Sequence, residues 1–377
     1  MSPKASSGAS LYDYLNWRGD LTYAQVCVGE ADNLIFSIIS YIDFSASVAE
    51  EFPETKPPVL LNATKKYLQG QQGILKDMGL MLSREIIALL VKASKTPRFG
   101  LVRPVCYVNR ICGEQQKQFS AISFLLPTGD VFVAYRGTDD SLVGWKENLN
   151  MCFMHPVPAQ SEALEYLEMI ASKTSGKIYV GGHSKGGNLA VFAAVKASKA
   201  TKERIVAVYS NDGPGFNKDF IKGADYRQMR ERIHTYVPQS SIVGRLLEHE
   251  ERYKVVKSRS DGLLQHDGLS WDIKGGGFVY LDDTDEESTK KALSIKKWLD
   301  TLSTDERMKF VDALYDAIVA TDAKTLSELN SDKFKLIKMW NTMDPVARTK
   351  FKTLMGIILG FGTNDAKSAQ KKEQNGK

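Results

Sequence analysis

The chain has 377 residues, 43% hydrophobic and 25% charged, a composition that can bury a large core and that suggests one main domain with an accessory region. Its formal net charge of +5 is small, and no cluster of basic and aromatic residues indicates a nucleic-acid partner. The 4 cysteines form no C-x-x-C pair, and no apolar run has the length of a signal peptide or a membrane span, so we expect a cytoplasmic protein.

The first part of the chain is predicted to be helical. Residues 1–10 are small and polar, and we expect them to be disordered. Apolar residues then recur at helical spacing over residues 11 to about 44 and about 62 to 94, on either side of a proline-rich loop. We assign residues 11–282 to the main domain, with residues 11–95 as a helical portion that can serve as a lid.

The middle of the chain alternates strands with helices. Two apolar runs around a Pro-Thr-Gly-Asp turn predict an antiparallel hairpin, and further short runs are separated by helical patterns. This alternation predicts an α/β fold, with a mostly parallel central sheet flanked by helices. The predicted strands are residues 121–126, 131–135, 178–182, 205–209, 233–237 and 253–256, and the predicted helices are residues 161–172 and 188–199.

The sequence changes character after residue 282. Residues 283–362 contain amphipathic segments rich in lysine and aspartate, which predict a helical C-terminal region. The polar residues 363–377 that follow are expected to be disordered. The amphipathic segments are residues 292–302, 306–319 and 333–359.

The strongest functional motif is a nucleophile elbow around Ser184. Residues 179–190 read YVGGHSKGGNLA, with a glycine two residues before the serine and another two residues after it. A strand that turns at once into a helix strains the serine backbone, and side chains at both flanking positions would clash, so both must be glycine. The turn lifts the hydroxyl above the sheet, and the helix N-terminus favours developing negative charge. Ser184 is therefore the predicted nucleophile.

Three segments in the same order resemble the lipase class 3 family. GHSKGGNLA at residues 182–190 is similar to the elbow of that family, and VFVAYRGTDDSLVGWKENLN at residues 131–150 is similar to its strand, turn and tryptophan segment. HDGLSW at residues 266–271 resembles the block around its catalytic histidine. The whole chain also looks like a bacterial family of lipase relatives with a GHSKGG elbow. These resemblances imply an α/β-hydrolase fold and ester hydrolysis.

His266 is the predicted general base. In α/β-hydrolases the base follows the acid along the chain, and His266 lies in a loop after the last predicted sheet strand. His183 stands beside the serine and is expected to point the wrong way, His155 precedes the serine, and His234 lies in a predicted strand. His249 lies among three glutamates, which predicts an exposed charged helix.

Asp212 is the predicted acid, because it is the first acidic residue after the strand at residues 205–209 and lies between the nucleophile and the base. Its block resembles the acid-bearing turn of pancreatic-type lipases, although an Asp before Gly can also simply cap a turn. In class 3 lipases the acid falls in a later block, where this chain has Ser240 and Ser241. The further alternatives are Asp261, Asp267 and a dyad without an acid.

The oxyanion hole is predicted to combine two backbone N–H groups. One belongs to Lys185, directly after the nucleophile. The family resemblance implies that Thr138, in the turn after the strand at residues 131–135, supplies the second N–H together with its hydroxyl; a plain turn is the alternative. Lys185 replaces the leucine that is usual in the family, so we expect a different acyl pocket.

These residues predict a serine hydrolase that cleaves small-molecule or lipid esters through an acyl-enzyme on Ser184. The alternatives are a weakened hydrolase scaffold used for binding or regulation, and acyl transfer or amide cleavage on the same machinery. No metal-ligand spacing such as H-E-x-x-H is present, and no cofactor is implied. The apolar residues 351–361 (FKTLMGIILGF) predict a preference for medium or long acyl groups and a possible peripheral contact with a membrane.

Overall fold

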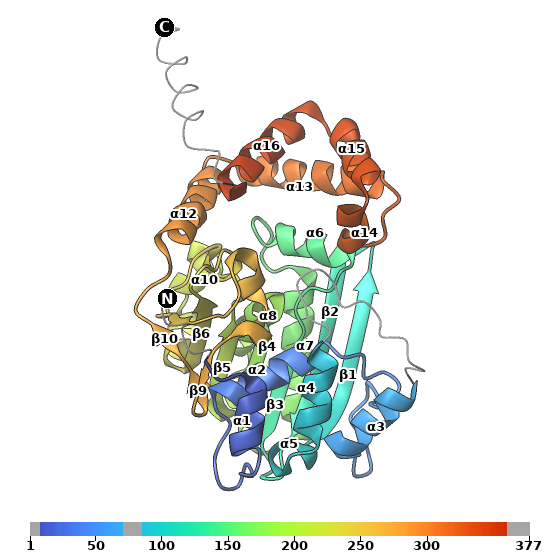
Figure 1. Cartoon of the computed structure of the whole chain (residues 1–377), viewed down its shortest axis with the longest axis vertical. Helices are drawn as coiled ribbons and strands as arrows, with labels where there is room; N and C mark the ends of the chain where they lie inside the picture. The colour runs from blue at the N-terminus through green and yellow to red at the C-terminus, as the bar shows by residue number, and fades with distance from the viewer. Residues whose placement is uncertain (1–7, 71–84, 360–377) are drawn as a thin grey trace, which may run out of the picture.

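The computed structural model describes residues 8–70 and 85–359 and is built around an eight-stranded sheet (Figure 1). Its strands, in the order in which they lie in the sheet, are β1 Arg103–Cys112, β2 Lys117–Leu125, β3 Val131–Tyr135, β4 Ile178–His183, β5 Ile205–Asn211, β6 Ile233–Pro238, β7 Lys254–Val256 and β10 Tyr280–Leu281. Strands β3 to β7 run parallel, whereas β1, β2 and β10 pair antiparallel at the two edges. The predicted fold class, an α/β-hydrolase fold with a mostly parallel sheet, is confirmed. A separate small ladder pairs β8 Ile273–Lys274 with β9 Gly277–Phe278.

The edge strand β1 is absent from the predicted strands. Its register with β2 shifts between Val105 and Val108, and Cys106 has a backbone φ of 55°. This β-bulge interrupts the alternation of apolar and polar side chains by which a strand is recognised in a sequence. Pro104 is tolerated because the strand lies at the edge of the sheet.

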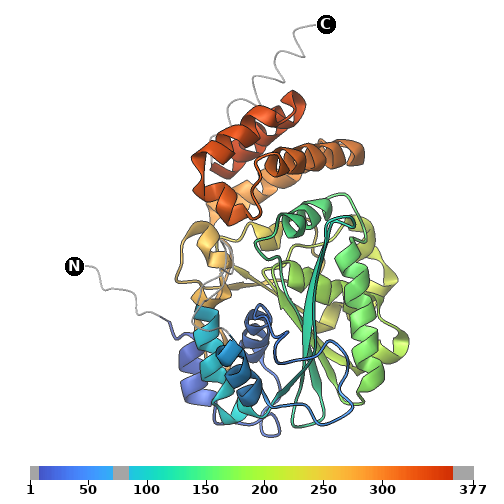
Figure 2. The same cartoon turned by 90° about the vertical axis from the view of Figure 1, so that its right-hand side faces the viewer.

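Helices cover both faces of the sheet (Figure 2). The N-terminal helices form one layer, in which every residue of α2 after Glu30 is buried and the helix packs on β4. Helices α7 and α8 form the layer on the opposite face. The helices of these layers and their connections are α1 Leu11–Arg18, α2 Glu30–Ile39, α3 Leu60–Gly70, α4 Glu85–Ser94, α5 Pro97–Gly100, α6 Leu142–Asn150, α7 Pro158–Lys173, α8 Lys185–Lys196, α9 Lys199–Arg204, α10 Lys218–Lys222 and α11 Ala224–Met229.

The N-terminal helical patterns correspond to several separate helices. Residues 11–44 contain two of them, α1 and α2, with a break that starts at Gly19. A Cβ atom at Gly19 would lie 2.3 Å from the Leu15 carbonyl oxygen, so only glycine fits at this helix end. The predicted helix at residues 62–94 corresponds to α3 and α4, and residues 71–84 between them lie outside the described residues.

Five helices within the described residues 286–359 lie together at one end of the molecule (Figure 1). They enclose a third apolar cluster, which Leu149 and Phe153 join from α6 and the loop after it, and Lys146 Nζ of α6 lies 3.0 Å from Asp312 Oδ1. The predicted helical segment at residues 333–359 consists of two helices, and the second begins at Pro345, which cannot continue the first. The helices are α12 Glu286–Asp300, α13 Thr304–Val319, α14 Leu326–Ser331, α15 Lys333–Thr342 and α16 Pro345–Leu359.

The predicted charged helix around His249 is wrong, because residues 249–252 have no helical structure. Glu251 is buried and accepts hydrogen bonds from Thr235 of β6 and from Tyr226, which ties this segment to the sheet. His249 Nδ1 lies 3.0 Å from Glu251 Oε1. Among the helices of residues 8–70 and 85–359, none combines the length and apolarity needed to cross a membrane.

Candidate active site

Ser184 lies at the sharp turn between β4 and α8. Its φ of 57° and ψ of −130° lie outside the regions that a non-glycine residue usually adopts, so its backbone is strained. A Cβ atom at Gly182 would lie 2.3 Å from the carbonyl carbon of Gly186, and one at Gly186 would lie 2.1 Å from the carbonyl oxygen of Tyr135. Both glycines of the motif are therefore required by close backbone contacts, as the sequence predicted.

Asp212 and His266 lie in direct contact. Asp212 directly follows β5 and has a φ of 52°, while His266 ends the short 3₁₀ helix Gly262–His266. His266 Nδ1 lies 2.6 Å from Asp212 Oδ2, and both side chains are buried. The other oxygen, Oδ1, accepts hydrogen bonds from the Ser241 hydroxyl and, at 3.1 Å, from the Gly244 N–H. The carboxylate is thus held in the position that orients a catalytic imidazole.

The other acid candidates make different contacts. Ser241 donates to Asp212, and Ser240 pairs with Gln265 in the loop that carries the histidine. Asp267 Oδ1 accepts a hydrogen bond from the Leu269 N–H, and burial raises the pKa of Asp267. Asp261 is exposed at the start of the 3₁₀ helix. None of these side chains is seen to hydrogen-bond the His266 ring within the described residues.

Ser184 and His266 face the same cavity, whose volume is about 150 Å³. In the described structure no hydrogen bond joins the Ser184 hydroxyl to the His266 ring, a contact that often forms only when substrate binds. The wall of the cavity is mostly apolar. The remaining lining residues are Tyr41, Thr138, Trp145, Asn148, Leu149, Met151, Cys152, His183, Pro214, Val243, Leu246 and Leu247.

The two predicted oxyanion residues are placed differently. Thr138 lines the cavity, and its hydroxyl oxygen is buried without a hydrogen-bond partner among the described residues. An unpaired buried hydroxyl is costly, and substrate can supply the missing partner. Lys185 follows Ser184 at the start of α8, where its backbone N–H lies at the positive end of the helix.

The Lys185 side chain turns away from the cavity, which corrects the expectation that it alters the acyl pocket. Its ammonium is buried and lies 2.8 Å from Glu147 Oε2, and it also donates to the backbone and side-chain oxygens of Gln118 at 2.6 and 2.7 Å. Burial lowers the pKa of Lys185, and the Glu147 carboxylate opposes this shift. The ion pair connects α8 to α6, and the hydrogen bonds to Gln118 connect α8 to β2.

His183 supports the loop that carries His266, a role that sequence reasoning missed. Its Nε2 lies 2.6 Å from the His266 carbonyl oxygen, and its Nδ1 lies 3.2 Å from the Tyr41 hydroxyl. A carbonyl oxygen only accepts, so Nε2 carries the proton and Tyr41 donates to Nδ1. Burial lowers the pKa of His183 to about 3, which keeps the ring neutral. Since both ring nitrogens are occupied, His183 is not available as a base for Ser184.

Helix α6 covers one side of the cavity, a role that was not predicted from the sequence, where only the tryptophan segment of the family resemblance pointed to this region. Trp145, Asn148 and Leu149 line the cavity from one face of the helix. The side-chain oxygen of Asn148 is buried and has no partner among the described residues. Substrate bound in the cavity would therefore meet apolar side chains and one unpaired amide.

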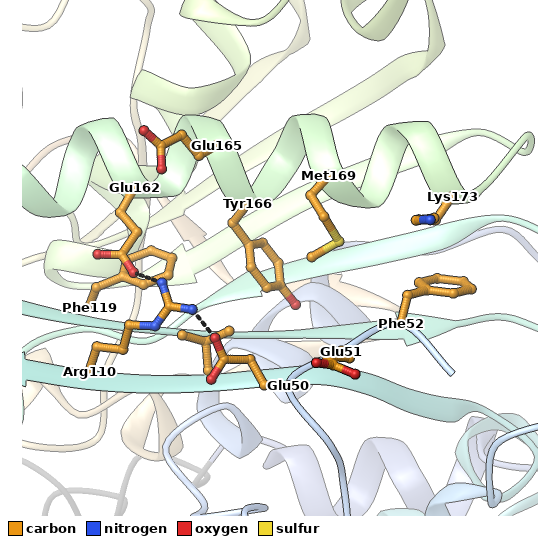
Figure 3. Close-up of a pocket in the computed structure, with 11 residues that line it drawn as sticks. Glu50, Glu51, Phe52, Arg110, Phe119, Glu162, Glu165, Tyr166, Met169 and Lys173 are labelled. Carbon is orange, nitrogen blue, oxygen red and sulfur yellow. Dashed lines mark hydrogen bonds and ion pairs between the residues drawn. The ribbon is translucent and has the colours of Figure 1, made fainter. Parts of the chain in front are cut away.

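A larger cavity of about 450 Å³ lies elsewhere, between α7 and the strands β1 and β2 (Figure 3). Arg110 joins Glu162, at 2.6 Å, to Glu50 across this cavity (Figure 3). None of the described residues that line it is a serine, cysteine or histidine. It therefore offers none of the side chains that nucleophilic catalysis of this kind requires. Within residues 8–70 and 85–359, no cluster of three or more His, Cys, Asp or Glu side chains is arranged to hold a metal ion.

Solved lipase structures are similar to parts of this chain. The native lipase propeptide complex of Rhizomucor miehei is 13% identical over 47% of this chain and 70% of that chain, with a TM-score of 0.33. M37 lipase is 18% identical over 56% of this chain and 68% of that chain, with a TM-score of 0.33. A mutant form of MDLA from Penicillium cyclopium is 11% identical over 66% of this chain and 83% of that chain, with a TM-score of 0.36.

No curated protein matches the chain. The family model for Mbeg1-like proteins matches residues 93–316, more than half of the chain. The matched range contains Ser184, Asp212 and His266, whereas Tyr41 and most of the C-terminal helices lie outside it. The chain therefore belongs to the Mbeg1-like family.

Proposed function

We propose that this protein is a lipase-like serine hydrolase that cleaves carboxylic esters through an acyl-enzyme on Ser184. The observation that carries the proposal is the contact between Asp212 and His266, made at the cavity that also holds the strained Ser184. Nucleophile, base and acid follow one another in the chain order of α/β-hydrolases. Ser184 and Asp212 directly follow the parallel strands β4 and β5, and His266 lies in the connection after β7, which supports the proposal because such sites lie beyond the carboxyl ends of parallel strands.

The proposed reaction has two halves. In the first, His266 Nε2 takes the proton from Ser184 as the hydroxyl oxygen attacks the ester carbonyl carbon, and then passes it to the departing alcohol. In the second, His266 deprotonates a water that attacks the acyl-enzyme, and the carboxylic acid is released as the proton returns to Ser184. Asp212 holds the ring tautomer and stabilises the imidazolium, while the N–H groups of Lys185 and Thr138 stabilise the oxyanion.

The alternative of a weakened scaffold was motivated by Ser240 and Ser241, which stand where class 3 lipases have their acid. The contact between Asp212 and His266 supports an active enzyme instead, since a carboxylate is present at the ring nitrogen. Ser241 contributes as a hydrogen-bond donor to that carboxylate. Acyl transfer and amide cleavage use the same residues, and no contact in the described structure favours either over hydrolysis.

The proposed substrate is a small-molecule or lipid ester with a medium or long acyl group. The apolar wall of the cavity supports this choice, because it favours hydrocarbon over polar acyl groups. A lipid ester is met at a membrane surface, so peripheral contact with a membrane belongs to the same proposal.

A fluorophosphonate probe tests the proposal directly, because it reacts only with an activated serine. We expect the wild-type protein to be labelled and the Ser184→Ala variant to remain unlabelled. A panel of 4-nitrophenyl esters with acyl chains of increasing length then defines the substrate, with the highest kcat/KM expected for medium or long chains. A wild-type protein that neither reacts with the probe nor cleaves any ester of the panel contradicts the proposal.

A further inference from the structure

Helix α15 exposes a row of large apolar side chains. Phe334 is 83% exposed, Ile337 57% and Trp340 37%, and the three recur every third residue on the outer side of the helix. The inner side is already occupied, because Leu336 and Met339 pack into the third apolar cluster. Trp340 also contacts the Phe351 ring of α16, with 6.5 Å between the ring centres, whereas Phe334 and Ile337 leave most of their surface exposed. Exposed apolar rows of this kind usually mark a contact surface.

The position of the row differs from the one that the sequence suggested. Residues 351–361 were the apolar segment expected to meet lipid, but Phe351 and Leu354 of α16 pack against the third cluster. Residues 360 and 361 lie outside the described residues. Helices α15 and α16 lie with the other C-terminal helices at one end of the molecule (Figures 1 and 2). The outer face of α15 is thus available to a large flat partner.

The charged residues around the apolar row of α15 favour a partner with negative charge. Residues 333–359 contain six Lys and Arg residues and a single Asp, so this segment accounts for the entire formal net charge of +5. Lys333 and Lys338 are exposed next to Phe334 and Ile337, and Lys338 pairs with Asp322 at 3.0 Å, an exposed ion pair that is weak in water. The Arg348 guanidinium lies 5.5 Å from the centre of the Trp340 ring. Two copies of this chain would bring like charges together, whereas an anionic surface would be attracted.

We propose that the outer face of α15, formed by Phe334, Ile337 and Trp340 with Lys333 and Lys338, docks on an anionic lipid surface. The apolar side chains enter the boundary between headgroups and acyl chains, where the indole of tryptophan is favoured, and the lysines meet the lipid phosphates. Only the purpose of this contact rests on the proposed function, since docking would bring the active site to lipid esters. The contact itself depends on no catalytic residue.

The test measures binding separately from catalysis, in the full chain carrying Ser184→Ala. Sedimentation with phosphatidylglycerol-containing vesicles is compared with sedimentation with phosphatidylcholine vesicles, and we expect binding to the anionic vesicles alone at low salt. The double variant Phe334→Ser/Ile337→Ser should lower partitioning roughly tenfold or more, because it removes two large apolar groups from the interface. Trp340 is an intrinsic reporter, and its emission should shift to shorter wavelength on binding, a shift that Trp340→Phe removes.

The matched control is Val26→Ser/Leu101→Ser, which removes two exposed apolar side chains, 46% and 56% exposed, next to α5, at the opposite end of the molecule from α15 (Figure 1). This control should bind as the parent does. Equal binding to neutral vesicles, no binding to either kind, or binding that survives Phe334→Ser/Ile337→Ser overturns the proposal. A dimer in solution that this double variant dissociates assigns the face to a second copy and also overturns it. A wild-type protein that binds the anionic vesicles but cleaves no ester would contradict the proposed function alone.

Discussion

The two sides of the active-site cavity satisfy their polar groups differently. On the side formed by the strand ends, Asp212, His266 and His183 are joined by hydrogen bonds to one another or to neighbouring residues. On the side formed by the loop after β3 and by α6, Thr138 and Asn148 each keep a buried oxygen without a partner among the described residues. The comparison indicates that the side chains which position the proposed catalytic residues already have hydrogen-bond partners in the absence of substrate. The polar groups on the opposite side are left for substrate to pair with.

The largest effect is expected for the proposed nucleophile, because neither side of the cavity can cleave an ester without it. Ser184→Ala should lower hydrolysis of activated esters roughly 10⁴-fold or more, because covalent catalysis is removed. The variant should fold normally, since the serine hydroxyl contributes little packing, and circular dichroism checks this. Full activity in the folded variant would rule out Ser184.

The second largest effect is expected on the side of the cavity where the polar side chains are hydrogen-bonded. Asp212→Asn should lower kcat by roughly two to four orders of magnitude with little change in KM, because the amide cannot stabilise the imidazolium. Asparagine tolerates the positive φ of this position, so the backbone should keep its course. Ser241→Ala is the matched control and should cost far less, since it removes only a donor to the carboxylate. Near-wild-type kcat in Asp212→Asn would place the acid at Asp261 or Asp267, or indicate a dyad.

A third prediction concerns the ion pair beneath the cavity. Lys185→Met leaves the buried Glu147 without its cation and should lower the free energy of unfolding by roughly 3–5 kcal/mol, measured by urea denaturation. The double variant Lys185→Met/Glu147→Gln should recover most of this loss, since it buries no unpaired charge. A single variant as stable as the wild-type protein would show that the pair contributes nothing.

His183 should make stability depend on pH. Its pKa is about 3 in the folded protein, below the ordinary 6.5, so the unfolded chain binds more protons between these values and stability falls as pH falls below about 6.5. Between pH 7.5 and 5 this histidine should account for about 2 kcal/mol of lost unfolding free energy. Denaturation of wild-type and His183→Gln proteins at both pH values measures the difference. An equal loss in both proteins would contradict this assignment.

The smallest effect is expected on the unpaired side. Thr138→Val removes a buried hydroxyl that has no partner among the described residues, so the free energy of unfolding should stay equal or rise by about 1 kcal/mol. The kcat/KM for esters should fall about tenfold if the hydroxyl serves the oxyanion as proposed. A fall in stability instead would show that the hydroxyl is paired at rest, and that the two sides of the cavity do not differ as described.

The parts of the site that were predictable from sequence are set by local chain geometry. Gly182 and Gly186 flank the serine within five residues, and Asp212 is the first acidic residue after a strand, so both follow from motif and element order. The supporting contacts do not follow in this way. Tyr41 and His183 are 142 positions apart, and Lys185 and Glu147 are 38 apart, so only the packed fold brings each pair together.

The fold was predictable where strands alternate regularly and less so where they do not. β3 to β6 are short buried runs next to helices, and their central residues appear in the sequence pattern. β1 was not predicted, because its bulge breaks the alternation of apolar and polar side chains. The helix predicted around His249 is absent, because a buried glutamate ties that segment to β6. The domain boundaries and the lid remain predictions.

Helix α6 contributes to the choice of substrate but supplies none of the proposed catalytic residues. Its nine residues place Trp145, Asn148 and Leu149 at the cavity, while the proposed nucleophile, base and acid all come from other segments. Substitutions in this one helix can therefore change which esters are accepted, while the proposed catalytic residues stay the same. This applies to a laboratory library and to a gene copy after duplication. Lys146 and Glu147, which anchor the helix to Asp312 and Lys185, are the two positions that such rewriting would have to keep.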